Sequence, residues 1–213
     1  MKSVFHRALY VTDYAKKMIG IVNYGAGNIF SLTAALDRIG IGYGMINEES
    51  DFDRYDRIII PGVGHAGMAM QKLEETGLVQ QIISLGKPVL GICVGMQLLT
   101  SFSEEGHAEL LNIVPLKTLY FNKRIAKKVP HMGWNSISAK EDCPLFENVA
   151  DNSYFYFVHS YFIEADEQYT GAFCTYDVVF SAAIQKDNFY GVQFHPEKSG
   201  KVGEQVLLNF SRL

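Results

Sequence analysis

The feature that most constrains the fold is the segment at residues 91–97, which reads Gly-Ile-Cys-Val-Gly-Met-Gln. It follows the apolar run at 88–90 and leads into a helix-like run at 96–99. This order predicts a strand, a sharp turn and a helix, with Cys93 at the apex and flanking glycines that leave room for strained backbone angles. Such a turn lifts a side chain clear of the sheet, so we interpret Cys93 as a catalytic nucleophile. The alternative is a buried structural thiol.

Strand-like and helix-like segments alternate through the first half of the chain. Strands are predicted at residues 18–22, 43–46, 57–60 and 87–91, and helices at about 29–39 and 68–85. The run at 58–60 is continuously apolar, as in strands buried on both faces. This alternation predicts an α/β fold with a mostly parallel central sheet flanked by helices.

After residue 110 the pattern changes to short strand-like segments separated by turn residues. They fall at residues 116–121, 134–137, 154–158, 161–164, 171–175, 179–185 and 189–193. Close spacing of this kind predicts antiparallel or mixed strands added to the parallel core, and residues 203–212 have the apolar face of a closing helix.

Composition and charge exclude several classes of protein. The chain has 213 residues, 48% hydrophobic and 20% charged, which suits one globular domain with a sizeable core. A net charge of −4 gives no reason to expect nucleic acid or an anionic membrane as partner. No apolar run approaches the roughly 20 residues of a membrane-spanning helix.

Cysteine usage indicates a reducing compartment. Cys93, Cys143 and Cys174 cannot form a fully paired disulfide framework and lack metal-binding spacing. We therefore expect a cytoplasmic protein without metal or other cofactor. Residues 1–17 show no continuous apolar stretch of a signal peptide, so we expect an N-terminal extension of unknown role followed by a single domain at 18–213.

A nucleophilic thiol needs a base, and the base needs a group that orients it. The segment at 194–197, Phe-His-Pro-Glu, supplies His195 and Glu197 directly after a strand-like run. In an extended segment, residues two apart point the same way, so both side chains are predicted to face one site. The alternative for His195 is a satisfied core or surface histidine.

The segment at 61–64, Pro-Gly-Val-Gly, follows the neighbouring predicted strand. Its glycines allow close approach of the backbone, so N–H groups of Val63 and Gly64 are candidates for one half of an oxyanion hole. The N–H of Val94, one residue past the nucleophile, is the candidate for the other half. An ordinary strand-to-helix turn is the alternative.

Together these three motifs resemble the class I, or triad, glutamine amidotransferases, over residues 18–213. The resemblance implies a flavodoxin-like fold and a glutaminase site, with Cys93 as nucleophile, His195 as general base and acid, and Glu197 as its orienter. It also implies glutamine-binding positions at Gln97, His159, Ser160 and Tyr161.

Further segments resemble one subfamily, which supplies ammonia to histidine biosynthesis. They are residues 23–28, 61–64, 130–135, 156–161 and 195–199. The resemblance implies a heterodimer with a (βα)₈-barrel cyclase subunit that receives the ammonia. Trp134, in an expected Gly-Trp-Asn turn, and Lys198 are candidate interface residues, with a core aromatic and a solvated lysine as alternatives. A paralogue serving amidino-sugar synthesis and a stand-alone γ-glutamyl cysteine hydrolase remain alternatives for the whole chain.

Overall fold

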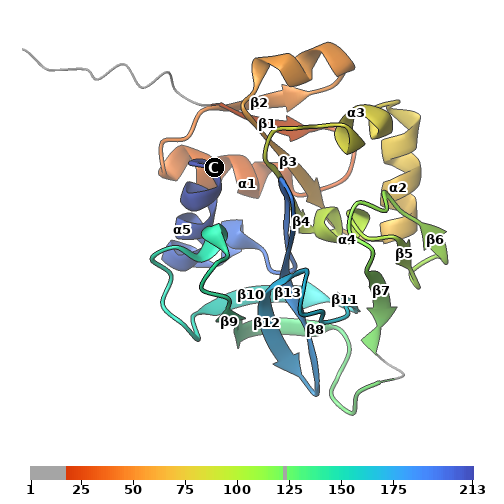
Figure 1. Ribbon diagram of the computed structural model, residues 1–213, viewed down its shortest axis with the longest axis vertical. Helices are drawn as coiled ribbons and strands as arrows, with labels where there is room; N and C mark the ends of the chain where they lie inside the picture. Colours follow the sequence, from red (N-terminus) through yellow and green to blue (C-terminus); the bar gives the residue numbers. More distant parts are fainter. Residues whose placement is uncertain (1–17, 122–123) are drawn as a thin grey trace, which may run out of the picture.

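The computed structural model describes residues 18–121 and 124–213, built around one mixed sheet (Figure 1). In spatial order, its eight strands are β2 (Tyr43–Ile46), β1 (Ile19–Val22), β3 (Arg57–Gly62), β4 (Val89–Cys93), β14 (Phe189–Val192), β13 (Val178–Lys186), β12 (Thr170–Tyr176) and β9 (Ser138–Ala139). The predicted α/β fold with added antiparallel strands is confirmed.

The sheet changes direction at β14. Strands β2, β1, β3, β4 and β14 run parallel to one another, whereas β13, β12 and β9 continue the sheet in antiparallel fashion. All residues of β1, β3, β4 and β14 are buried, as expected for strands covered on both faces. The carboxyl ends of β4 and β14 therefore lie side by side, which brings Cys93 close to the segment that follows β14.

Two smaller sheets lie beside the antiparallel half. One has four strands in the order β11 (Tyr161–Ile163), β7 (Lys117–Tyr120), β5 (Phe102–Ser103) and β6 (Ala108–Glu109). The other pairs β10 (Tyr154–His159) with β8 (His131–Ser136). Strands β5, β6 and β9 were not predicted, because two residues carry no readable periodicity. Trp134 lies within β8, so the strand predicted at 134–137 is confirmed, whereas the turn also expected at Trp134 was wrong.

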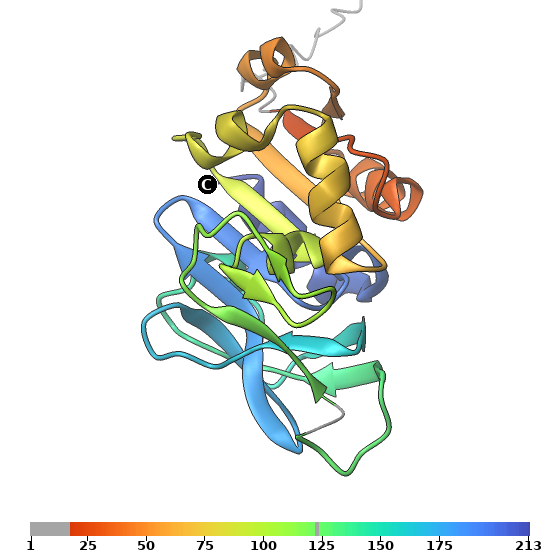
Figure 2. The same cartoon turned by 90° about the vertical axis from the view of Figure 1, so that its right-hand side faces the viewer.

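Helices cover both faces of the parallel half. Figures 1 and 2 show α1 (Ile29–Arg38) and α5 (Gly200–Phe210) on one face, and α2 (Ala66–Glu75) with α4 (Val94–Leu98) on the other. The helix predicted over 68–85 is broken. It ends at Glu75, and α3 (Val79–Ile83) begins after Gly77, whose φ of 74° is left-handed. Short 3₁₀ turns occur at Glu49–Arg54, between β2 and β3, and at Pro144–Phe146 and Pro196–Lys198.

The buried apolar side chains form one contiguous cluster that extends through both halves of the main sheet. In the described part of the chain, no helix has the length and apolarity needed to cross a bilayer. The extension expected at residues 1–17 lies outside the described residues.

Candidate active site

Cys93 occupies the apex of a strained turn between β4 and α4. It is the last residue of β4, and α4 begins at the next residue. Its backbone angles are φ 55° and ψ −109°, an unfavourable combination for a residue with a side chain. Strain of this kind costs about 1–3 kcal/mol and persists only where surrounding contacts enforce it.

Three glycines provide those contacts by bringing backbones unusually close. A Cβ on Gly95 would lie 1.9 Å from the carbonyl oxygen of Ile60, and one on Gly91 would lie 2.4 Å from the carbonyl oxygen of Gly95. A Cβ on Gly62 would lie 2.4 Å from the amide nitrogen of Gly95. The glycines thus let α4 lie directly on β3 and β4, and this packing holds Cys93 in its strained geometry.

His195 and Glu197 form a buried pair next to this apex. Nδ1 of His195 lies 2.8 Å from Oε1 of Glu197, and their side chains are only 2% and 4% exposed. The segment is a 3₁₀ turn over Pro196–Lys198, so the predicted extended geometry was wrong. The two side chains meet nonetheless, because the turn folds the carboxylate back onto the ring.

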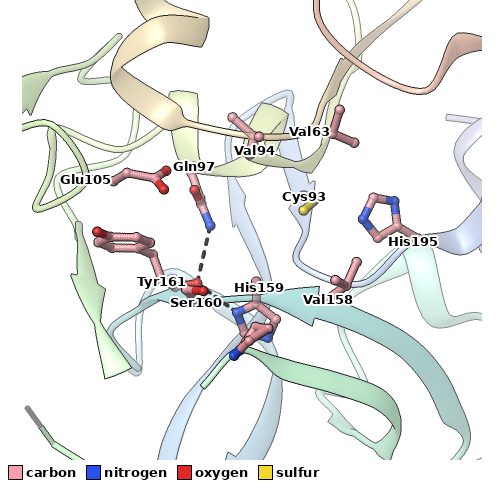
Figure 3. Close-up of a pocket in the computed structure, with 12 residues that line it drawn as sticks. Val63, Cys93, Val94, Gln97, Glu105, Val158, His159, Ser160, Tyr161 and His195 are labelled. Atoms are coloured by element: carbon pink, nitrogen blue, oxygen red, sulfur yellow. Dashed lines mark hydrogen bonds between the residues drawn. The ribbon is translucent and has the colours of Figure 1, made fainter. Parts of the chain in front are cut away.

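The pair fixes the tautomer of His195. Since Nδ1 donates to a carboxylate, Nε2 is left to face the pocket; it is buried without a nitrogen or oxygen partner among the described residues. Figure 3 shows the ring of His195 beside the sulfur of Cys93. Burial alone would lower the pKa of His195, but interactions with Cys93 and Glu197 outweigh it and raise that pKa above its ordinary value. Such a histidine is suited to hold a proton beside a thiolate.

Ser199 anchors the His195 segment to β10. Its hydroxyl accepts from the backbone N–H of Tyr156 at 3.0 Å and donates to the carbonyl of His195 at 2.7 Å. The N–H of His195 donates to the carbonyl of Tyr156 at 2.9 Å. These three hydrogen bonds hold the histidine against a strand that also lines the pocket.

The thiol opens into a cavity of about 290 Å³ (Figure 3). Its lining combines the apex, the strand ends and the connection between β10 and β11: Val63, Gly64, Cys93, Val94, Gln97, Glu105, Pro130, Val158, His159, Ser160, Tyr161 and His195. The structure therefore brings every predicted catalytic, oxyanion and substrate residue to one place, except Glu197, which supports His195 from behind. Among the described residues, no cluster of side chains is arranged to hold a metal ion.

Gln97 and His159 differ in what they offer to a ligand. Nε2 of Gln97 donates to the carbonyl of Tyr161 and to Oε1 of Gln193, whereas its Oε1 is buried and has no partner within residues 18–121 and 124–213. His159 has both ring nitrogens engaged, Nδ1 with the carbonyl of Tyr161 at 2.7 Å and Nε2 with His131 at 2.9 Å. Gln97 thus keeps a free acceptor, while His159 contributes shape to the pocket and holds Tyr161.

The two candidate interface residues lie outside the cavity but near each other. Trp134 is 55% exposed, so its alternative as a core aromatic is wrong. It contacts Tyr156 edge to face, and the ammonium of Lys198 lies 5.9 Å from the centre of the same ring. Tyr156 therefore joins both residues into one surface beside the pocket.

Comparison with known proteins places the chain in a family. The family model for class-I glutamine amidotransferases matches residues 21–212. The chain belongs to this family. The amidotransferase is 46% identical over 195 residues to the imidazole glycerol phosphate synthase subunit HisH of Haemophilus influenzae, covering 90% of this chain and 96% of that protein. It is also 46% identical over 200 residues to the protein of the same name from Chlorobaculum tepidum, covering 91% and 99%.

Solved structures share the fold of this amidotransferase at much lower identity. A putative GMP synthase protein from Thermoplasma acidophilum superposes with a TM-score of 0.71 at 19% identity, covering 92% of each chain. The PurLQS structure from Thermotoga maritima gives a TM-score of 0.66 at 18% identity, covering 92% of this chain and 97% of that one.

Two residues that line or support the pocket of the amidotransferase were not predicted as site residues from the sequence. Glu105 lines the cavity, and its Oε2 accepts from the N–H of Ala66 at 2.6 Å. Tyr24 donates from its hydroxyl to the carbonyl of Pro61 at 2.6 Å and so holds the end of β3 in place. Burial, then the charge of Cys93, raise the pKa of Tyr24. No local motif marks Glu105, whereas Tyr24 lies within the segment 23–28 already noted in the sequence.

Proposed function

We propose that this amidotransferase is the glutaminase subunit of an imidazole glycerol phosphate synthase. It would hydrolyse L-glutamine to glutamate and ammonia and pass the ammonia to a cyclase subunit in histidine biosynthesis. Relatives of that name are matched over nearly their whole length at 46% identity. The observation that carries the chemistry is Cys93 on a strained apex beside the buried His195–Glu197 pair.

The proposed reaction begins at the sulfur. The Cys93 thiolate attacks the side-chain amide carbon of glutamine, and the carbonyl oxygen takes the negative charge. N–H groups of Val63, Gly64 and Val94 are proposed to hold this oxyanion, because all three residues line the cavity next to the thiol. Each such donor is typically worth on the order of 10²–10³ in rate.

His195 completes the proposed cycle as a proton carrier. Its Nε2 proton passes to the leaving nitrogen, the C–N bond breaks, and ammonia departs from a γ-glutamyl thioester. Nε2 then takes a proton from water, and the hydroxide attacks the thioester. The C–S bond breaks, the new carboxyl group loses the second water proton to solvent, and glutamate leaves with Cys93 again a thiolate beside protonated His195. Glu197 keeps Nδ1 protonated throughout, since the carboxylate accepts from it at 2.8 Å.

The pocket also offers groups that match the α-amino-acid end of glutamine. The buried Oε1 of Gln97, which has no partner in the described part of the chain, and the carboxylate of Glu105 can accept from the α-ammonium group. We propose Ser160 and Tyr161 as further contacts, and His159 as the residue that fixes the position of Tyr161.

The ammonia must reach its acceptor before it escapes to water, and this requires a partner over the pocket. Exposed apolar side chains gather at the carboxyl edge of the parallel strands and on β8, at Phe30, Val63, Met68, Met132 and Trp134. We propose that this docking surface, with Lys198 at its border, receives a (βα)₈-barrel cyclase subunit to form a heterodimer.

We further propose that residues 18–213 act as one amidotransferase domain, which the single contiguous core supports. A cytoplasmic location is proposed with it, because a catalytic thiol is preserved in a reducing compartment.

The deciding experiment measures glutamate release by the purified chain, alone and with a cyclase subunit that holds its ribonucleotide ligand. We expect weak turnover alone and strong stimulation by the complete complex. Equal turnover under all conditions would instead identify a stand-alone hydrolase. Cys93→Ala should abolish release, whereas Cys143→Ala, which removes a buried thiol outside the pocket, should retain it.

A further inference from the structure

Gln193 is a fully buried side chain that contacts the proposed nucleophile, Cys93. It follows β14 directly and precedes His195 by two positions. Its Nε2 lies 3.7 Å from Sγ of Cys93, within reach of a hydrogen bond to sulfur. Its Oε1 lies 3.1 Å from Nε2 of Gln97. The proposed catalytic cycle does not use it, although it reaches the reacting atom.

The hydrogen bonds around Gln193 determine which way its amide points. Nε2 of Gln97 faces the carbonyl of Tyr161 at 3.3 Å, so this nitrogen is the donor end of Gln97. Oε1 of Gln193 must therefore face Gln97, because a rotated amide would set two donors against each other. It follows that the N–H₂ group of Gln193 faces the sulfur, and an amide nitrogen can only donate.

Further hydrogen bonds hold the carbonyl of Tyr161 in place, and their directions can be assigned in the same way. Nδ1 of His159 donates to that carbonyl, which makes Nε2 of His159 an acceptor for Nδ1 of His131. Nε2 of His131 then accepts from the side-chain amide of Asn135 at 3.3 Å. A directed chain of hydrogen bonds thus runs from β8 to the carbonyl on which the orientation of Gln97, and through it Gln193, depends.

We propose that Gln193 is a further catalytic residue, whose side-chain N–H stabilises and aims the thiolate of Cys93. A thiolate accepts hydrogen bonds more strongly than a thiol, so this donor favours the nucleophilic form. It also restricts the sulfur to the direction set by the strained apex. This role deepens the proposed glutaminase function and rests on it.

Other titratable side chains lie in or beside the same pocket as Cys93. His195 and Glu197 follow β14, Tyr24 precedes α1, and Glu105 and His159 line the cavity. Substitution of Gln193 leaves all of these groups in place. A change in thiolate formation can therefore be assigned to the lost donor.

The test measures the pH dependence of Cys93 alkylation by iodoacetamide, followed by mass spectrometry on the intact chain. Gln193→Met removes the donor without adding charge or a new hydrogen-bonding group. The free energy of a hydrogen bond to a charged group exceeds the free energy that corresponds to one pKa unit, so we expect the apparent pKa of alkylation to rise by about one unit or more in Gln193→Met.

Gln80→Met, at an exposed position on α3, is the matched control and should keep the wild-type profile. Circular dichroism establishes that each variant is folded before alkylation. An unchanged alkylation profile in folded Gln193→Met would overturn the role of Gln193, even if glutamate release is normal in the wild type. Absence of glutamate release by the wild-type complex would overturn the proposed function instead, while the alkylation profile still reports on Gln193.

Discussion

His131 and His159 face each other directly across the β8–β10 pair, with Nδ1 of one 2.9 Å from Nε2 of the other. Both rings must be neutral, because Nε2 of His159 accepts from Nδ1 of His131, and Nε2 of His131 accepts from the side-chain amide of Asn135. Burial lowers the pKa of His131 to about 4, with the charge of Lys127 contributing, and burial together with His131 lowers that of His159 to about 3.

This pair predicts a loss of stability in mild acid. In the unfolded chain both histidines return to a pKa of about 6.5, so below that pH the unfolded state binds more protons than the folded state. The free energy of unfolding should therefore fall as the pH drops from about 6.5, by roughly 2 kcal/mol for each histidine at pH 5. The raised pKa of His195 does not oppose this trend, because its contribution is already complete below its unfolded pKa.

Urea unfolding between pH 7 and 5 tests this prediction. The double variant His131→Gln/His159→Gln keeps polar groups at both positions but cannot titrate, so its unfolding free energy should vary much less over the same range. His107→Asn, at an exposed position with left-handed φ, should behave like the wild type. Parallel pH curves for the double variant and the wild type would contradict the proposal that these rings are held neutral.

Gly95→Ala should lower both the stability of the fold and the reactivity of Cys93. Its Cβ would meet the Ile60 carbonyl at 1.9 Å, so α4 must move away from β3. We expect a loss of about 1–3 kcal/mol in unfolding free energy, and slower alkylation of Cys93. Gly86→Ala, where a Cβ would have no described residue within 4 Å, should be neutral or slightly stabilising. Normal Cys93 reactivity in Gly95→Ala would show that close packing is not what holds the apex.

Glu105→Gln should weaken glutamine binding more than the chemical steps. The amide can still accept from the N–H of Ala66, but it loses the charge proposed to meet the α-ammonium group. We expect KM for glutamine to rise roughly 10–100-fold with a smaller change in kcat, measured by glutamate release in the complex. Glu109→Gln, exposed on β6, is the control and should leave KM unchanged.

Trp134→Ala should weaken association with the cyclase subunit. A large aromatic that is 55% exposed beside the pocket has the character of an interface anchor. We expect the dissociation free energy to fall by about 2 kcal/mol, measured by isothermal titration of the two subunits. Val179→Ala, an apolar residue 54% exposed on β13 and outside the docking surface, should bind normally. Equal affinity for both variants would move the interface away from β8.

Several features of this protein follow from local sequence alone. The apolar runs and their glycine-rich ends determine the parallel strands, because burial on both faces excludes polar residues over a continuous stretch. The strained turn at Cys93 was also predictable from the sequence, since only glycine at positions 91 and 95 permits the close packing of α4 on the sheet. His195 and Glu197 are two residues apart, so their pairing needed only a local turn.

Only the tertiary structure decided how distant segments complete the site. Gln193 and Cys93 are 100 residues apart, and they meet because β14 inserts beside β4 in parallel register. Glu105 reaches the cavity through its hydrogen bond to the start of α2, and the His131–His159 contact depends on the register of β8 against β10. Sequence periodicity reports which face of a strand is buried, but it does not report which strands become neighbours. The residues that surround the thiol are set by that choice of neighbours.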